Sequence, residues 1–524
     1  MKSKTAILSI TLVLSLVQSP TWAQFEATFE LSDLNSLNGF TLNGIDNGDA
    51  SGHSVSPAGD FNDDGIDDII IGAYAAGVEN SGSSYVVFGS DGQLPNPINL
   101  STLNGSNGFT INGVTDGDIS GFSVSAAGDI NGDGKDDIII GSMGVDIAGD
   151  NGIGASYVLF GTSTPLPTPF NLSDINGLNG FVIYGISAGD RLGYSVSQAG
   201  DINGDGVDDL IVAARDVNFS TGSSYVIFGS TDPLPNPLYV ENLDGSNGFS
   251  IIGVQDGDTL NGISVSGAGD INNDGFDDVL IGASHAENAH GVAYVVFGFD
   301  DAFISSINLV NLNAINGFTI NGADQFDKLG HSVSSAGDMN GDGIDDLIVG
   351  AKDRHANGFA GAGSSFVVFG SNNPMPNPLN INSINGINGF TINGVAQDDN
   401  SGTSVSSAGD INGDGYSDLI IGAHAASPNG KSNAGSSYVV FGTGSRPPNP
   451  FNLSNLDGSN GFVINGINSV DQSGYSVSSA GDVNNDGIND LLIGAPYADP
   501  NGNEGAGSSY VVFGNDVIFK HGLE

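Results

Sequence analysis

The sequence predicts an all-β fold, a seven-bladed β-propeller with four antiparallel strands in each blade. A unit of 68 to 72 residues recurs seven times, and every copy contains four short segments rich in Val, Ile, Phe and Tyr. No stretch of the repeat shows the 3.6-residue periodicity of a helix. An Asp that follows Ala-Gly marks each copy, at Asp60, Asp129, Asp201, Asp270, Asp338, Asp410 and Asp482. This even spacing leaves no room for an inserted domain, so we expect one propeller domain over residues 24–514; a linear solenoid is the competing architecture.

The four segments of the second unit run from Gly121 to Gly128, Asp137 to Gly141, Ser156 to Gly161 and Gly180 to Gly185. The run Ile69-Ile70-Ile71 in the first unit is apolar without alternation, as expected of a strand covered on both faces by neighbouring blades. The run Ser54-Val55-Ser56 is small and semi-polar. It therefore suits the innermost strand, where seven blades crowd around one axis.

The two ends of the chain favour a closed ring. A segment with the pattern GF-x-(I/L)-NG opens the repeat region at Phe40, before any acidic loop, and none follows Phe513-Gly514. The last blade thus lacks its outer strand, while the start of the chain has one to spare. We expect Gly39 to Gly44 to complete blade seven, which joins both ends and removes the unpaired sheet edges.

The composition excludes several classes of protein. The 524 residues include 60 Asp and Glu but only 11 Lys and Arg, a formal charge of -49. Nucleic acids and anionic membranes are excluded as partners, because contacts with phosphate require surface Lys and Arg. Charged residues are 14% and hydrophobic residues 39%, so the chain is able to build a core. The absence of cysteine excludes disulfides, Cys-ligated zinc, iron–sulfur clusters and thiol catalysis.

The first 23 residues read as a signal peptide. Lys2 and Lys4 precede an apolar run from Ala6 to Val17, and cleavage is expected near Ala23. A membrane anchor is the alternative, although the run is shorter than the ~20 residues that span a bilayer, and no later segment could span one. The mature chain is therefore expected to be secreted or held at the cell surface, as a monomer. Residues 515–524 lie outside the repeat, as a sorting signal or a frayed end.

Between the first two strands of every unit the sequence reads D-x-N-x-D-G-x-x-D. Calcium takes six to eight oxygens, and acidic and amide side chains at alternate positions, with one backbone carbonyl, place such oxygens around one point. A glycine after the third ligand, Gly65 in the first loop, permits the turn that aims this carbonyl inward. We expect up to seven calcium ions. The predicted ligands, with the carbonyl donor fourth in each set, are Asp60, Asn62, Asp64, Ile66 and Asp68; Asp129, Asn131, Asp133, Lys135 and Asp137; Asp201, Asn203, Asp205, Val207 and Asp209; Asp270, Asn272, Asp274, Phe276 and Asp278; Asp338, Asn340, Asp342, Ile344 and Asp346; Asp410, Asn412, Asp414, Tyr416 and Asp418; and Asp482, Asn484, Asp486, Ile488 and Asp490.

An EF-hand, a plain hairpin turn and a magnesium site all fit this loop less well. An EF-hand requires a bidentate Glu at position twelve and flanking helices, whereas position twelve is Ile71 in the first loop and Ile140 in the second. A hairpin turn with incidental acids would account for one copy more easily than for seven. Magnesium is less suited, because it retains its waters and a rigid octahedron.

The full unit, G-x-S-V-S-x-A-G-D-x-N-x-D-G-x-D-D-(L/I)-I-I-G-A followed by Y-V-V-F-G, resembles the FG-GAP repeat of integrin alpha chains over Phe25 to Gly514. The resemblance implies a calcium-binding seven-bladed propeller that serves as an extracellular recognition or adhesion module. The unit departs from the family pattern in that the Phe of the first FG is replaced in every copy, and the Gly-Ala-Pro triplet is complete only at Gly494-Ala495-Pro496. The leg domains, membrane anchor and beta partner of integrins are not implied.

The loops between the second and third strands vary and are expected on the face opposite the acidic loops. Basic residues gather on this face, at Arg191, Arg215, Lys328, Lys352, Arg354 and Lys431. One hypothesis is that they bind a protein or glycan ligand of negative charge. The alternative is that variable loops collect any residue the repeat does not need. No catalytic motif is found, so we expect no enzyme; a carbohydrate-active lyase or hydrolase and a structural matrix component are the alternative functions.

Overall fold

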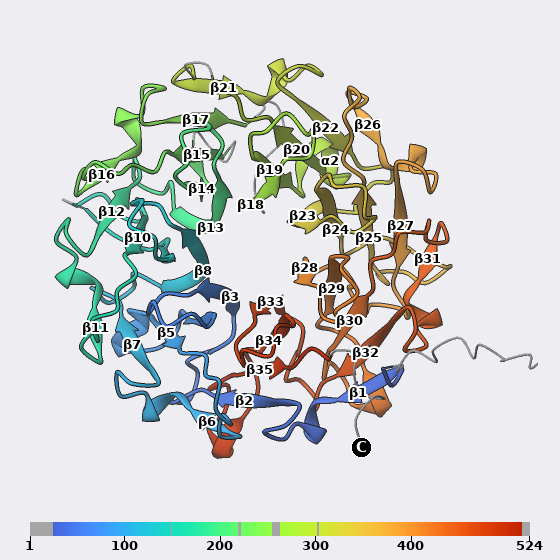
Figure 1. Cartoon of the computed structure of the whole chain (residues 1–524), viewed down its shortest axis with the longest axis horizontal. Coiled ribbons are helices and arrows are strands. Elements are labelled where there is room, and N and C mark those ends of the chain that lie inside the picture. Colours follow the sequence, from blue (N-terminus) through green and yellow to red (C-terminus); the bar gives the residue numbers. More distant parts are fainter. Residues whose placement is uncertain (1–24, 148, 218–221, 254–262, 301–302, 516–524) are drawn as a thin grey trace, which may run out of the picture.

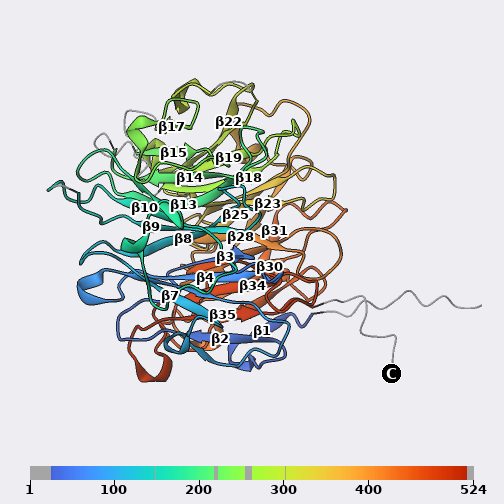
Figure 2. The ribbon, with the colours of Figure 1, turned by 60° about the vertical axis from the view of Figure 1, so that its left-hand side comes forward.

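The computed structural model describes residues 25–147, 149–217, 222–253, 263–300 and 303–515, and it confirms the seven-bladed propeller. Seven sheets stand around a common axis (Figure 1). Turned by 60°, the ring shows the connecting loops gathered on its two opposite faces (Figure 2). The predicted signal peptide and the tail beyond Asn515 lie outside the described residues. No helix in the described ranges is both long enough and apolar enough to cross a membrane.

Each sheet contains the four antiparallel strands that the sequence predicts. The innermost strands are β3 (Ser54–Gly59), β8 (Ser120–Gly128), β13 (Leu192–Gly200), β18 (Ile263–Gly269), β23 (Leu329–Gly337), β28 (Ser404–Gly409) and β33 (Ser476–Gly481). The second strands are β4 (Asp68–Ala73), β9 (Asp137–Ser142), β14 (Asp209–Ala214), β19 (Asp278–Ala283), β24 (Asp346–Ala351), β29 (Asp418–Ala423) and β34 (Asp490–Ala495). The third strands are β5 (Ser83–Val87), β10 (Ala155–Leu159), β15 (Ser223–Ile227), β20 (Val292–Val296), β25 (Ser364–Val368), β30 (Ser436–Val440) and β35 (Ser508–Val512). The fourth strands are β7 (Gly108–Asn112), β12 (Gly180–Tyr184), β17 (Gly248–Ile252), β22 (Gly317–Asn321), β27 (Gly389–Asn393), β32 (Gly461–Asn465) and β2 (Gly39–Asn43).

A short fifth strand at the outer edge was not predicted. It comes from the connector of the next unit and pairs in parallel with the fourth strand; β11, for example, joins β7 with Phe170 opposite Ile111. These outer strands are β11 (Phe170–Asn171), β16 (Leu238–Tyr239), β21 (Ser306–Asn308), β26 (Leu379–Asn380), β31 (Phe451–Asn452), β1 (Thr28–Glu30) and β6 (Ile98–Asn99). A 3-10 turn follows each of them, and among the described residues the α-helix is limited to the four residues of α2 (Ala286–Ala289). The connectors thus tie each blade to the previous one.

The start of the chain closes the ring, as predicted. Strand β2 pairs antiparallel with β35 of the last unit, from Gly39 opposite Val512 to Asn43 opposite Ser508. In Figure 1 this places the blue start of the propeller beside its red end. Strand β1 goes one blade further and pairs with β32 of blade six. Two segments of the start therefore hold two different blades.

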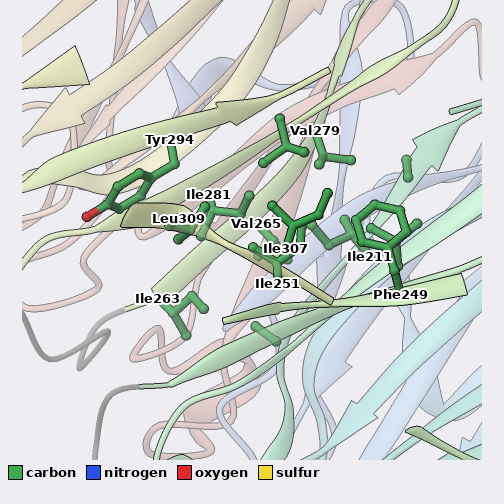
Figure 3. Close-up of a cluster of buried hydrophobic side chains, with 14 of the residues drawn as sticks. Ile211, Phe249, Ile251, Ile263, Val265, Val279, Ile281, Tyr294, Ile307 and Leu309 are labelled. Atoms are coloured by element: carbon green, nitrogen blue, oxygen red, sulfur yellow. The ribbon is translucent and has the colours of Figure 1, made fainter. Parts of the chain in front are cut away.

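The hydrophobic core is divided into seven layers, each between two neighbouring blades. In Figure 3, Ile211 and Phe249 of blade three lie against Val265, Val279 and Ile281 of blade four. All six residues of every second strand are buried, which confirms the prediction from the apolar run in the first unit. Because these strands are covered on both faces, each blade depends on its two neighbours for burial of apolar surface.

Serine hydroxyls join the innermost strands. The hydroxyl of Ser54 in blade one accepts a hydrogen bond from the backbone N–H of Val124 in blade two, at 3.1 Å. The same bond recurs at five other junctions, including Ser476 to Val55 across the closure of the ring. The small residues at the axis were predicted from crowding alone; the structure adds that one of these serines links neighbouring blades.

Ring closure is tested by truncating Phe40. Its side chain is 1% exposed and packs between blades seven and one. We expect Phe40→Ala to lower the free energy of unfolding by about 3–5 kcal/mol, because it leaves a cavity at the closing seam. Leu37→Ala is the matched control, since Leu37 is 83% exposed. Urea unfolding measures both, and a loss at Phe40 no larger than that at Leu37 would contradict this mode of closure.

Candidate metal and ligand sites

The acidic loops and the Pro-rich connectors share one face, as predicted. Ser90 of the first connector donates its N–H to the carbonyl of Val483 in the seventh acidic loop, at 2.9 Å. Between blades five and six an open groove of about 660 Å³ is lined by Asp342 of the fifth loop and by the connector residues Pro374 and Arg446. This face is therefore built from one acidic loop and one connector per blade.

Within each acidic loop the first Asp holds the turn together. In the first loop, Asp60 accepts hydrogen bonds from the N–H groups of Asp64 and Gly65, both at 2.8 Å, one on each carboxylate oxygen. Gly65 has a φ of +85°, a conformation that favours glycine, so its predicted role in the turn is confirmed. The same pair of bonds recurs in the other six loops. All seven loops thus have one backbone design.

The ninth residue of the loop is a fully buried carboxylate. Asp68 is 0% exposed, and its Oδ1 accepts a hydrogen bond from the N–H of Gly89, at 2.9 Å. Burial raises the pKa of Asp68 to about 8; the Gly89 contact opposes this rise, and the nearby carboxylates of Asp64 and Asp60 add to it. Gly89 ends the Y-V-V-F-G segment, and the same contact to this glycine is made in every blade. The final glycine of the motif therefore has a structural role, since its amide holds the loop.

The residues of these loops have the donor chemistry that calcium requires. The amide oxygens of Asn272, Asn412 and Asn484, at the third position of loops four, six and seven, are buried and have no hydrogen-bond partner among the described residues. Such an oxygen is costly to bury unless something binds it. In the described residues, no group of three or more Asp, Glu or His side chains is placed so that it could hold a metal ion. The loops therefore supply oxygens of the right kind, with their carboxylates turned toward backbone N–H groups.

On the opposite face, five of the six predicted ligand-binding cations already have partners within the chain. Arg191 and Arg215 both lie beside Asp216, at 3.4 and 3.9 Å. Lys328 pairs with Asp353 at 2.7 Å. The remaining two contacts are Arg354 with Asp327 and the Lys431 ammonium with the carbonyl of Ile467. An anionic ligand would have to compete with these internal contacts.

Lys352 is the exception. Its side chain is half-buried, and its ammonium group has no ion pair or hydrogen bond within the described ranges. Burial lowers the pKa of Lys352 below its usual value, while the neighbouring Asp353 opposes this shift. Of the six predicted basic residues, Lys352 is therefore the one whose charged group has no ion pair or hydrogen bond in the described structure.

Aromatic side chains gather around the axis on this face, a feature that the sequence interpretation missed. They occupy the position just before the S-V-S segment, where the innermost strands begin. The ring of His53 lies 4.8 Å from Phe122 and 5.1 Å from Tyr475, and Phe122 lies 5.2 Å from Tyr194, between ring centres. The seven residues at this position are His53, Phe122, Tyr194, Ile263, His331, Thr403 and Tyr475. Their variation between otherwise similar units was the signal in the sequence.

Comparison with known proteins places the chain in a family. The FG-GAP repeat model matches residues 51–87, 120–159, 192–227, 261–296, 329–368, 401–440 and 473–512, together just over half of the chain. The chain belongs to the FG-GAP repeat family. Each match begins at an innermost strand or up to three residues before it and ends with the third strand, so each FG-GAP match covers the first three strands of one blade.

Several curated proteins are similar to parts of this FG-GAP protein. Integrin alpha pat-2 of Caenorhabditis elegans is 31% identical over 246 residues, which are 45% of this chain and 18% of that protein. Integrin alpha-5 of Xenopus laevis is 30% identical over 239 residues, 44% of this chain and 20% of that protein. A phosphatidylinositol-glycan-specific phospholipase D of Homo sapiens is 27% identical over 223 residues, which are 41% of this chain and 24% of that protein. The matched region thus covers about a quarter or less of these relatives.

The eighth residue of each FG-GAP loop links neighbouring blades and was not predicted to do so. Asp136 of the second loop accepts a hydrogen bond from the N–H of Asp60, the first residue of the preceding loop, at 2.8 Å. Across the closure, Asp67 accepts from the N–H of Asp482 at 2.7 Å. Asn489 replaces Asp at this position and makes the same bond, while Ser417 donates its own N–H to the carbonyl of Asp338. The acidic loops are therefore joined into a continuous ring.

The histidine at the axis makes stability depend on pH. Burial lowers the pKa of His53 to about 4, although the contact of its ring with the carbonyl of Phe122 opposes this shift. The unfolded chain, with a His pKa near 6.5, binds the proton more tightly, so stability is lost as the pH falls from 6.5 toward 4. When the pH falls from 7 to 5, the free energy of unfolding should decrease less in His53→Phe than in the parent protein. The difference between the two decreases should be at most about 2 kcal/mol.

Urea unfolding at the two pH values measures this difference, with His355→Phe as the control because His355 is exposed. The comparison of pH slopes separates protonation from any change in packing. Identical slopes for the parent and His53→Phe would contradict the predicted shift.

Proposed function

We propose that this protein is an extracellular, non-catalytic binding module whose seven acidic loops bind calcium and whose opposite face binds a protein or glycan ligand. The observation that carries the proposal is the division of the ring into two faces. One face repeats the same acidic loop in all seven blades, and the other differs from blade to blade. Such a design is compatible with a rigid scaffold that presents variable loops to a ligand. The similarity to integrin alpha chains supports a location outside the cell.

The calcium ligands would be the side chains of the first, third, fifth and ninth loop residues and the carbonyl of the seventh. In the first loop these are Asp60, Asn62, Asp64, Asp68 and the carbonyl of Ile66. Calcium would supply the positive charge that a buried carboxylate such as Asp68 lacks in the described structure. The amide oxygens without partners in loops four, six and seven support this assignment. The chain holds these groups in place through the N–H groups of Gly65 and Gly89.

Calcium binding is expected to stabilise the ring. A site filled at a hundred times its dissociation constant contributes about 2.7 kcal/mol, so the melting temperature should rise with calcium and fall when EGTA is added. Thermal unfolding in calcium, magnesium and EGTA measures this effect. Asp482→Asn should reduce the calcium response, whereas the control Asp91→Asn, at an exposed connector position, should not. A melting temperature indifferent to chelator would contradict calcium binding.

The second loop is expected to bind calcium more weakly than the others. The ammonium of Lys135 lies 3.7 Å from Asp133, a predicted ligand, and 3.8 Å from Asp63 of the first loop. A fixed positive charge at this distance opposes the entry of a cation. Lys135→Ile, which copies Ile66 of the first loop, should tighten the weakest site by about tenfold.

Calorimetric titration measures the calcium affinity of the sites. Arg446→Met is the control, because it removes a positive charge from a connector on the same face, outside the acidic loops. An unchanged weakest site in Lys135→Ile would contradict this reasoning.

The ligand itself is tested by a binding screen against glycans and matrix proteins, in calcium and in EGTA. Binding that requires calcium-loaded protein supports the module. A turnover assay on the same glycans addresses the alternative of a carbohydrate-active enzyme, since cleavage would contradict a non-catalytic role.

A further inference from the structure

An arc of aromatic rings lines part of the axis on the variable-loop face. It runs from Tyr475 of blade seven through His53 and Phe122 to Tyr194 of blade three, with each ring centre within 5.2 Å of the next. These side chains are partly exposed, and the segment that follows each of them enters the innermost strand. The arc is therefore a surface of adjoining rings at the start of the innermost strands. Tyrosine contributes a flat apolar face and a polar hydroxyl to such a surface.

A basic arc lines the blades that the rings leave out. His331 of blade five occupies the position equivalent to His53, and its Nδ1 is buried without a hydrogen-bond partner among the described residues. Burial and then the positive charges of Lys352 and Lys328 lower the pKa of His331 to about 3, so its imidazole is neutral. Lys328 is paired with Asp353, whereas the ammonium of Lys352 has no partner in the part of the chain described. Two nitrogen groups are thus left for a ligand.

The two arcs meet at His424. Its ring lies 5.6 Å from Tyr475 of the aromatic arc; burial and then the charge of Lys352 lower its pKa to about 4, so the ring is neutral and close enough to Lys352 to be affected by its charge. The chain as a whole has a large excess of negative charge, with 60 acidic residues against 11 basic ones. An anion is therefore repelled from most of the surface, whereas Lys352 offers it an ammonium group that has no ion pair or hydrogen bond in the described part of the chain, although Asp353 lies near enough to act on it. The aromatic arc and the charge of Lys352 thus both reach His424.

From this juxtaposition we propose that the axial end of the variable-loop face binds a uronic-acid unit of an acidic polysaccharide, with its carboxylate at Lys352 and His331 and its sugar ring against Tyr475 and His53. The proposal rests on the proposed function, since it names the ligand of the binding face. The carboxylate gains a charge-assisted contact with an ammonium that has no internal partner. The sugar ring covers apolar aromatic surface, while its hydroxyls remain close to tyrosine and histidine.

A sugar acid suits this place better than an acidic peptide. The aspartate or glutamate side chain has a carboxylate but no sugar ring whose C–H face could pack on aromatic side chains, so it would leave the aromatic arc uncovered. A neutral sugar would cover the arc but leave Lys352 unpaired. The uronic acid combines both groups in one unit, and His424 connects the two arcs, since it contacts Tyr475 and interacts electrostatically with Lys352.

Calorimetric binding of galacturonate oligomers to the full chain in calcium tests the proposal, with galactose oligomers as the probe that lacks the carboxylate. Lys352→Met and Tyr475→Ala should each weaken galacturonate binding by about tenfold or more. Arg446→Met, on the opposite face, and Tyr239→Ala, on the outer strand β16, are the matched controls and should bind as the parent does. Galactose oligomers should bind at least about tenfold more weakly than galacturonate.

Four results would overturn the proposal: no binding of galacturonate, equal binding of the neutral oligomer, unchanged affinity in both Lys352→Met and Tyr475→Ala, or binding of polyglutamate in preference to galacturonate. Melting curves verify that each variant is folded. If Tyr475→Ala is unfolded, Tyr475→Leu replaces it, with Tyr475→Phe as the variant that keeps the ring. Failure here is distinguishable from failure of the proposed function, because the stabilisation by calcium and the wider ligand screen are measured separately.

Discussion

The whole structure depends on the packing of each sheet between two neighbours. The second strand of every blade has no solvent-facing side: Ile69, Ile70 and Ile71 are each at most 1% exposed. A single blade could not bury such a strand, and an open row of blades would leave two apolar faces in water at its ends. Closure is therefore required by the composition of the strands. The chain meets this requirement by using its start, β2, as the missing strand of the last blade.

Polar contacts set how the blades are placed once apolar burial has brought them together. Near the axis, serine hydroxyls join one innermost strand to the next, as between Ser54 and Val124. On the acidic face, the eighth loop residue of one blade holds the first loop residue of the blade before it, as between Asp136 and Asp60. A predicted metal ligand, Asp60, is thus fixed by the next blade. Any ion bound in one loop would consequently stabilise a junction between blades as well as a loop.

Much of the fold could be predicted because the same pattern of strands, turns and acidic residues recurs in all seven units. The period, the strand order, the closing strand and the turn at Gly65 all follow from patterns that recur in each copy. The fifth strand could not be predicted, because two residues such as Ile98 and Asn99 are too short to show a period, and their partner lies in another unit. The role of Asp136 was hidden for a similar reason: it stands next to the predicted ligand Asp137, and only the neighbouring blade distinguishes the two.

On the candidate binding face, the sequence predicted which residues are present but not how they are paired. Six basic residues were predicted there from their place in the loops, but their pairing depends on side-chain positions in adjacent blades, as for Arg191 and Arg215 around the single Asp216. An unpaired cation such as Lys352 cannot be told from a paired one by counting charges. At the axis, the differences between the units are what the structure makes significant. Seven equivalent positions surround one point, so any difference among His53, His331 and Tyr475 makes that point asymmetric. A symmetric ring can distinguish one ligand orientation from another only through such differences, and in this protein they coincide with the unpaired Lys352.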